Sequence, residues 1–227
     1  AVLKDPRTYE HVPPESTGNK RHILISDQAG KANVLMQLAD MGIEVAADDK
    51  RIMSLVNEVK DKEFQGYTYD GAEASFELLA RRALGDVPEY FNVDGFRVMV
   101  ERRHNAKGEL VTVSEATVKV TVDGETLMSA GEGNGPVNAL DEALRKDLGK
   151  YSSYIEDLEL ADYKVRILSQ EGTGAVTRVM IESVDKDGNR WSTVGVSPNI
   201  VDASFQALLD SIVYKLFRDG APAGTSA

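Results

Sequence analysis

Glycines at every second position form the most suggestive chemical feature of the chain, in the stretch Gly131-Glu-Gly-Asn-Gly-Pro136. Such a stretch between a strand and a helix leaves backbone N–H groups at the helix start that can receive a carboxylate or another anion. It lacks the Lys-Ser/Thr pair of a phosphate-binding loop, which disfavours nucleotide binding. The glycines are expected to permit positive φ angles in a tight turn, and Pro136 suits the first helical position.

Other residue types indicate no catalytic chemistry. The three histidines, His11, His22 and His104, are far apart and form no His-x-His or His-x-x-x-His pair, so a metal site within the chain is not expected. The absence of cysteine excludes thiolate nucleophiles and disulfides, and no Gly-x-Ser-x-Gly motif occurs. Carboxylate pairs such as Asp48-Asp49 are expected on solvated surfaces. The residues alone therefore predict a binding and assembly module without catalytic residues.

Composition limits the partners of this 227-residue chain, which is 42% hydrophobic and long enough for one large domain or two small ones. A formal charge of −11 repels phosphate backbones and anionic membranes, so we expect neither nucleic acid nor membrane as a partner. No apolar run reaches the roughly 18 residues of a membrane span, and the first residues do not resemble a secretory signal. We therefore expect a soluble, cytoplasmic protein.

Hydrophobic spacing divides the chain into a helical and a mixed part. Apolar residues at helical intervals predict three helices, one that ends at Gly42 and two that span 49–63 and 72–84. Residues 1–90 are therefore expected to be mostly helical. Period-two alternation then predicts six strands, at 96–103, 111–122, 125–130, 163–170, 176–184 and 190–194. Amphipathic helices follow the third and the sixth strand, from about Val137 and over 201–216, and residues 221–227 form a tail.

The mixed part contains an internal repeat. The hairpin dipeptide Asp123-Gly124 recurs 64 positions later as Asp187-Gly188. The same offset relates five further pairs: Gly131 and Gly195, Val137 and Val201, Ala139 and Ala203, Ala143 and Ala207, Leu144 and Leu208. The repeat predicts an α+β fold in which helical linker subdomains precede a pseudo-twofold pair of βββα units at 91–220. Two such sheets leave apolar surface that a monomer does not readily bury, which predicts a homodimer.

Several stretches resemble one enzyme family. Residues 131–140, 162–165, 172–175 and 195–200 resemble the C-terminal regulatory domain of the 2-isopropylmalate synthase and citramalate synthase family. Tyr9-Glu-His-Val12 and residues 66–76 resemble the linker subdomains of the same family, particularly in its citramalate synthase branch. The resemblance covers essentially the whole chain.

The resemblance implies the function of a parent enzyme. Family members condense acetyl-CoA with pyruvate or 2-oxoisovalerate in a TIM barrel that holds a divalent metal. Because such a barrel takes about 250 residues, the chain as given is expected to hold no cofactor and to be a non-catalytic regulatory and dimerisation region. Tyr9, His11 and Asn19 would support the active site of a neighbouring subunit. Three alternatives stay open: the parent is a citramalate synthase (isoleucine biosynthesis), it is a 2-isopropylmalate synthase (leucine biosynthesis), or the region is purely structural.

The resemblance also implies a pocket at the dimer interface for an end-product amino acid, isoleucine or leucine. Two helix starts would receive the ligand carboxylate, and aliphatic and aromatic walls would enclose its branched side chain. Where some relatives carry an acidic residue suited to the ligand ammonium, this chain has Gly174. The implied effector-binding residues are Gly133, Asn134, Gly135, Pro136, Val137, Tyr163, Ile167, Thr173, Gly174, Ala175, Asn199 and Ile200.

Overall fold

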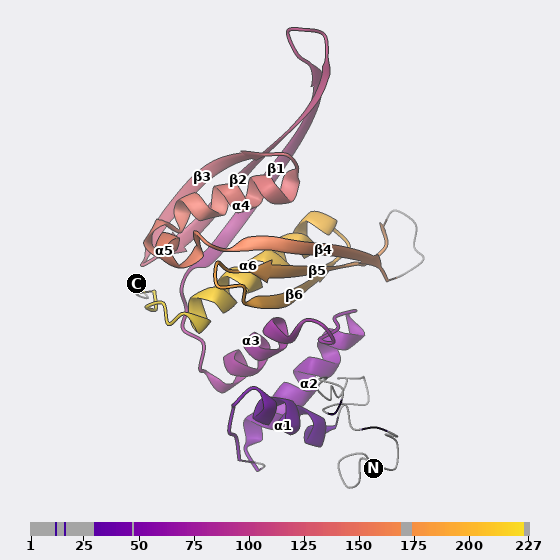
Figure 1. The fold of residues 1–227 in the computed structure, drawn as a ribbon, viewed down its shortest axis with the longest axis vertical. Helices are drawn as coiled ribbons and strands as arrows, with labels where there is room; N and C mark the ends of the chain where they lie inside the picture. The colour runs from indigo at the N-terminus through magenta and orange to yellow at the C-terminus, as the bar shows by residue number, and fades with distance from the viewer. Residues whose placement is uncertain (1–11, 13–15, 17–29, 47, 169–173, 225–227) are drawn as a thin grey trace.

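The computed structural model describes residues 12, 16, 30–46, 48–168 and 174–224. Within these residues, three helices precede two units that each contain a three-stranded antiparallel sheet and a long helix (Figure 1). This order confirms the predicted α+β fold of helical segments followed by two βββα units. No helix in the described ranges is both long enough and apolar enough to cross a bilayer.

The first unit consists of β1 (Asn92–His104), β2 (Leu110–Val122), β3 (Glu125–Gly133) and the helix α4 (Pro136–Asp147). The strands pair in chain order, and Asp123-Gly124 forms the predicted hairpin with both residues at positive φ. Alternate residues of β2 are buried on the side that α4 covers, which is the period-two pattern of a half-buried strand: Ser114, Ala116, Val118, Val120 and Val122.

The second unit consists of β4 (Glu159–Ile167), β5 (Thr177–Val184), β6 (Arg190–Ser197) and α6 (Ile200–Arg218). Two short helices that hydrophobic spacing does not predict connect the units, η3 (Gly149–Tyr151) and α5 (Ser152–Ile155). β4 begins at Glu159, before the predicted residue 163. The prediction missed its first residues because they are exposed and show no alternation of buried and exposed side chains. A register shift between Leu160 and Asp162 marks a bulge in that part of the strand.

The glycine-rich stretch is mostly strand, which corrects the predicted turn. β3 continues to Gly133, and none of Gly131, Gly133 and Gly135 is among the residues at positive φ. Gly135 is extended, with a φ of −166°, and Pro136 occupies the first turn of α4 as predicted. The reason for glycine is therefore not a left-handed backbone.

A close crossing of helix over strand explains the glycines instead. A Cβ atom on Gly131 would lie 2.6 Å from the carbonyl oxygen of Ala139 and 2.5 Å from the nitrogen of Ala143. In the second unit, a Cβ atom on Gly195 would overlap the carbonyl oxygen of Ala203. These residues occupy equivalent positions in the 64-residue repeat, so the repeat reflects the same backbone contact in both units.

The helical part has its own core. Its helices are α1 (Lys31–Asp40), α2 (Lys50–Phe64) and α3 (Glu73–Leu84). The Asp49 carboxylate accepts a hydrogen bond from the Arg51 backbone N–H at 2.8 Å and caps α2. The buried stripe of α2 is the predicted one: Ile52, Leu55, Val56 and Val59. α3 packs against β6 and α6, so the helical part is fixed onto the second unit.

The two units share one hydrophobic core, as expected for paired halves. Phe96 in β1 packs edge to face on Phe205 in α6, with ring centroids 4.8 Å apart. Buried residues of both sheets, of α4 and of α6 form one continuous cluster. Val194 and Val196 in β6 pack instead with the core of the helical part. β6 is therefore covered on both faces, by α6 and by the helical part.

A buried carboxylate, Asp185, organises the loop between β5 and β6. Its side chain is 1% exposed and accepts hydrogen bonds from the backbone N–H groups of Asp187 and Asn189, from Asn189 Nδ2 and from Arg218 Nη2. These bonds, led by the one from the Asn189 side chain, hold the pKa of Asp185 well below its usual range. A lowered folded-state pKa stabilises the fold above the unfolded-state pKa of about 4, and this stabilisation is lost as pH falls.

We expect Asp185→Asn to lower the free energy of unfolding at neutral pH, because the ionised acceptor of four hydrogen bonds is lost. The difference from wild type should shrink as pH is lowered from about 5 to about 3, since the wild-type carboxylate loses its advantage there. Urea unfolding at several pH values measures this. Asp187→Asn, an exposed position in the same loop, is the matched control and should follow wild type. A difference between Asp185→Asn and wild type that is constant over this range would contradict the assignment.

Candidate functional site

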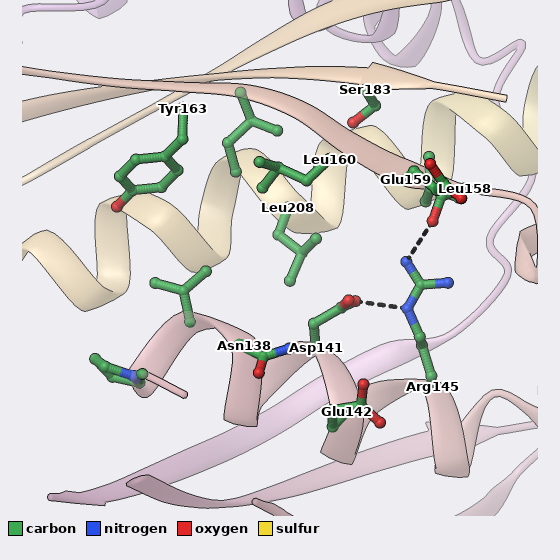
Figure 2. A pocket seen from close by; sticks show the side chains of 14 residues that line it. Asn138, Asp141, Glu142, Arg145, Leu158, Glu159, Leu160, Tyr163, Ser183 and Leu208 are labelled. Carbon is green, nitrogen blue, oxygen red and sulfur yellow. Dashed lines mark hydrogen bonds and ion pairs between the residues drawn. The ribbon is translucent and has the colours of Figure 1, made fainter. Parts of the chain in front are cut away.

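A cavity of about 790 Å³ lies between the start of α4 and the second unit, within the usual size range of small-molecule sites. Figure 2 shows side chains of α4 on one side, Leu160 and Tyr163 of β4 on the other, and Leu208 of α6 between them. The lining residues come from α4, β4, β5, α6 and the segment before β4: Gly135, Pro136, Val137, Asn138, Asp141, Glu142, Arg145, Leu158, Glu159, Leu160, Tyr163, Ile181, Ser183 and Leu208.

One wall of the cavity is apolar. Leu160, Leu208 and the ring of Tyr163 contribute to it. The Tyr163 hydroxyl is hydrogen-bonded to Ser204 Oγ, which itself donates to the carbonyl of Ile200, so the ring is held against the first turns of α6. A fixed aromatic ring beside aliphatic side chains suits a branched aliphatic group.

The opposite wall is charged. Arg145 Nε donates to Asp141 Oδ1 at 2.8 Å, and its Nη1 and Nη2 donate to the carbonyl oxygens of Ile155 and Leu158 at 2.6 and 3.2 Å. Arg145 thus ties α4 to the segment that precedes β4. Burial raises the pKa of Asp141, and the guanidinium of Arg145 opposes this shift. The cavity therefore places a half-buried ion pair next to apolar surface.

The two helix starts differ. The side chain of Asn199 caps α6 by accepting a hydrogen bond from the Val201 N–H at 3.0 Å. Gly135 gives α4 no side-chain cap, and the N–H groups of Val137 and Asn138 have no acceptor within the helix. Because Gly135, Val137 and Asn138 line the cavity, the uncapped helix start borders it. That start is the one suited to a ligand carboxylate.

The structure brings four of the predicted effector residues to this cavity, Gly135, Pro136, Val137 and Tyr163. Gly133 and Asn134 precede them at the same helix start, where Asn134 N–H donates to Asn138 Oδ1. The other described residues of the prediction do not line the cavity, because they lie at the start of α6, at the end of β4 or before β5: Ile167, Gly174, Ala175, Asn199 and Ile200. Thr173, Tyr9, His11 and Asn19 lie outside the described residues.

Sequence reasoning missed the charged wall and two residues of the apolar wall, Leu160 and Leu208. Asp141 and Arg145 are four residues apart on α4, a spacing typical of a helical ion pair, and this signal was available. Leu160 precedes the predicted start of its strand, and Leu208 belongs to a stripe that indicates only burial. Across the parts of the chain that the structure describes, no group of three or more His, Asp or Glu side chains is arranged to hold a metal ion.

Comparison with known proteins identifies two families. Residues 70–216 match the LeuA allosteric (dimerisation) domain, and residues 1–66 match the homocitrate synthase post-HMGL domain-like family. The chain is 49% identical over 219 residues to the (R)-citramalate synthase of Geobacter sulfurreducens and 46% identical over 220 residues to that of Aquifex aeolicus; each alignment covers 96% of this chain and 41% of the relative. It is 31% identical over 211 residues to a probable 2-isopropylmalate synthase of Methanopyrus kandleri, covering 93% of this chain and 40% of the relative. The chain thus spans about two fifths of the length of the curated relatives it matches, and the resemblance expected from sequence is confirmed.

Proposed function

Because this chain belongs to the LeuA allosteric (dimerisation) domain family, we propose that it is the C-terminal regulatory and dimerisation region of a citramalate synthase-like acyltransferase. The parent protein would condense acetyl-CoA with pyruvate in isoleucine biosynthesis and would hold its divalent metal outside this region. The identities of 49% and 46% to (R)-citramalate synthases favour this parent over a 2-isopropylmalate synthase, for which the identity is 31%.

The proposed effector is a branched-chain amino acid, and isoleucine follows from the proposed parent. The supporting observation is a cavity in which an apolar wall faces an uncapped helix start. The N–H groups of Val137 and Asn138 would receive the ligand carboxylate, and Leu160 and Leu208 would contact its aliphatic side chain. The acidic side chains that line the cavity, Asp141, Glu142 and Glu159, would attract the ammonium, a role that Gly174 does not fill.

A continuous set of contacts leads from this cavity to the helical part. α6 carries both Leu208, in the cavity wall, and Asp210, whose carboxylate accepts hydrogen bonds from Ser75 Oγ and Arg82 Nη1 of α3, each at 3.0 Å. Ser75 Oγ also accepts from the Val194 N–H of β6 at 3.0 Å. Burial raises the pKa of Asp210, and the charge of Arg82 opposes the shift. A ligand that moves α6 would therefore act on α3, which is the coupling that a regulatory region needs.

Calorimetric titration with L-isoleucine and L-leucine tests the proposal, with D-isoleucine as a control of the same composition. We expect L-isoleucine to give saturable heat and a negative heat-capacity change, since it buries apolar surface. At a hundred times its Kd it should raise the free energy of unfolding by about 2.7 kcal/mol. Binding of leucine alone would favour the 2-isopropylmalate synthase alternative.

A second candidate function is a purely structural dimerisation module, which the family description of dimerisation favours as much as regulation. Heat from neither amino acid, together with a dimer in sedimentation, would leave this function in place and remove the regulatory one. A monomer in sedimentation would remove both.

A further inference from the structure

The hairpin of β1 and β2 extends beyond its sheet as a two-stranded arm. Ser114 is the first residue of β2 that pairs with β3, and it also pairs with Val100, so residues 101–113 have no third strand and Val100 lies at the base of this extension (Figure 1). We call residues 100–113 the arm. An isolated two-stranded ribbon is at best marginally stable in water. The arm therefore needs a surface to pack on.

One face of the arm carries two exposed apolar side chains, with Arg102 and Thr112 between them. Val100 pairs with Ser114 and Leu110 pairs with His104, so Val100 and Leu110 lie on the face that continues the α4-covered side of the sheet. Their side chains are 55% and 49% exposed. α4 begins only at Pro136, after the end of β3, and does not extend over the arm (Figure 1).

A second exposed apolar patch lies at the start of α6, and we call it the β4 patch. It consists of Val165, Ile167 and Ile200. Val165 and Ile167 follow Tyr163 on the same face of β4, and Ile167 is in register through Thr177 with Ser197, just before the helix. Ile167 is 67% exposed and Ile200 is 46% exposed, so this face is incomplete in a single copy of the chain.

Charge favours contact between these two surfaces of different copies. On the face with Val100 and Leu110 the arm carries the basic residue Arg102, whereas Glu101 and Arg103 lie on its other face. Two arms packed on each other would bring their basic residues together. The β4 patch instead has Asp202 in the first turn of α6, and the basic residues Lys164 and Arg166 lie on the opposite face of β4. Opposite charges beside apolar contacts favour the arm against the β4 patch.

We propose that the arm of one copy docks its Val100 and Leu110 face on the β4 patch of a second copy, and that the second copy returns the same contact. This rests on the homodimer of the proposed function and names the surfaces that form it. A twofold dimer makes each such contact twice, so both exposed patches of both copies are covered.

Crosslinking tests the contact directly, because the chain has no cysteine and introduced thiols are unique. A Leu110→Cys copy co-expressed with an Ile167→Cys copy should be joined by a short bismaleimide, and neither variant alone should form crosslinked dimers. Met128→Cys, exposed on the other face of the first sheet, replaces Leu110→Cys as the control and should give no product with Ile167→Cys. Crosslinked dimers from Leu110→Cys alone would overturn the proposal in favour of contact between arms.

Sedimentation separates failure of this proposal from failure of the proposed function. Leu110→Glu should raise the dissociation constant of the dimer by roughly a hundredfold or more, since each dimer then buries two unpaired charges. Met128→Glu should leave it unchanged. A wild-type dimer that Leu110→Glu does not weaken would overturn the arm contact alone. A wild-type monomer would contradict the dimer on which both rest.

Discussion

Replacing Gly195 by alanine is expected to destabilise the chain by roughly 3 kcal/mol or more, the upper range for overpacked cores. The added Cβ atom would overlap the carbonyl oxygen of Ala203 and would lie 3.0 Å from the backbone nitrogen of Ala207. Both neighbours are backbone atoms of α6, so no side-chain rotation relieves the clash. The whole helix would have to move away from β6. Urea unfolding followed by circular dichroism measures the loss.

The matched control is Gly149→Ala, at an exposed glycine where an added Cβ atom would have no heavy atom within 4 Å and where φ is not positive. It should change the free energy of unfolding by no more than about 0.5 kcal/mol. Gly131→Ala should resemble Gly195→Ala, because its Cβ would meet backbone atoms of α4 at 2.5 and 2.6 Å. Stability close to wild type in Gly195→Ala would contradict the close crossing as the reason for the repeat.

The two βββα units could be predicted because their signals are local. Alternation in β2, the Asp-Gly hairpins and the stripes of α4 and α6 depend on neighbours in sequence, and each agrees with the structure. The role of Gly131 could not be predicted in the same way. A glycine in a turn and a glycine under a crossing helix look alike in sequence, and only the packing of α4 on β3 separates them.

The sequence predicted cavity residues at the start of α4 but not those farther along α4 and on α6. Val137 and Tyr163 follow from the resemblance, and the structure places both at one cavity. Arg145 and Leu208 depend on how α4 and α6 are rotated toward each other, which hydrophobic spacing leaves undetermined within a stripe. The predicted residues at the start of α6, Asn199 and Ile200, belong to the equivalent helix start of the other unit. The pseudo-twofold relation between the units accounts for this division.

Filling the cavity tests which of the two helix starts binds the ligand. Leu160 is 51% exposed and lines the cavity opposite α4, so Leu160→Trp adds an indole there without disturbing the core. We expect the affinity for L-isoleucine to fall at least about a hundredfold, equivalent to about 2.7 kcal/mol, because the bulky side chain occupies the space between Tyr163 and Leu208. The free energy of unfolding should change little, since the site is at the surface. Calorimetric titration of the variant measures the loss.

Met128→Trp adds the same side chain at an exposed position on the first sheet, away from the cavity, and should bind like wild type. If Leu160→Trp instead keeps the wild-type affinity, the ligand does not occupy this cavity. The remaining predicted residues would then place the ligand at the start of α6, where Ile200 is 46% exposed. In that case Ile200→Trp, rather than Leu160→Trp, should weaken binding of L-isoleucine. The pair of variants thus assigns the effector to α4 or to α6, because each indole blocks one helix start and leaves the other open.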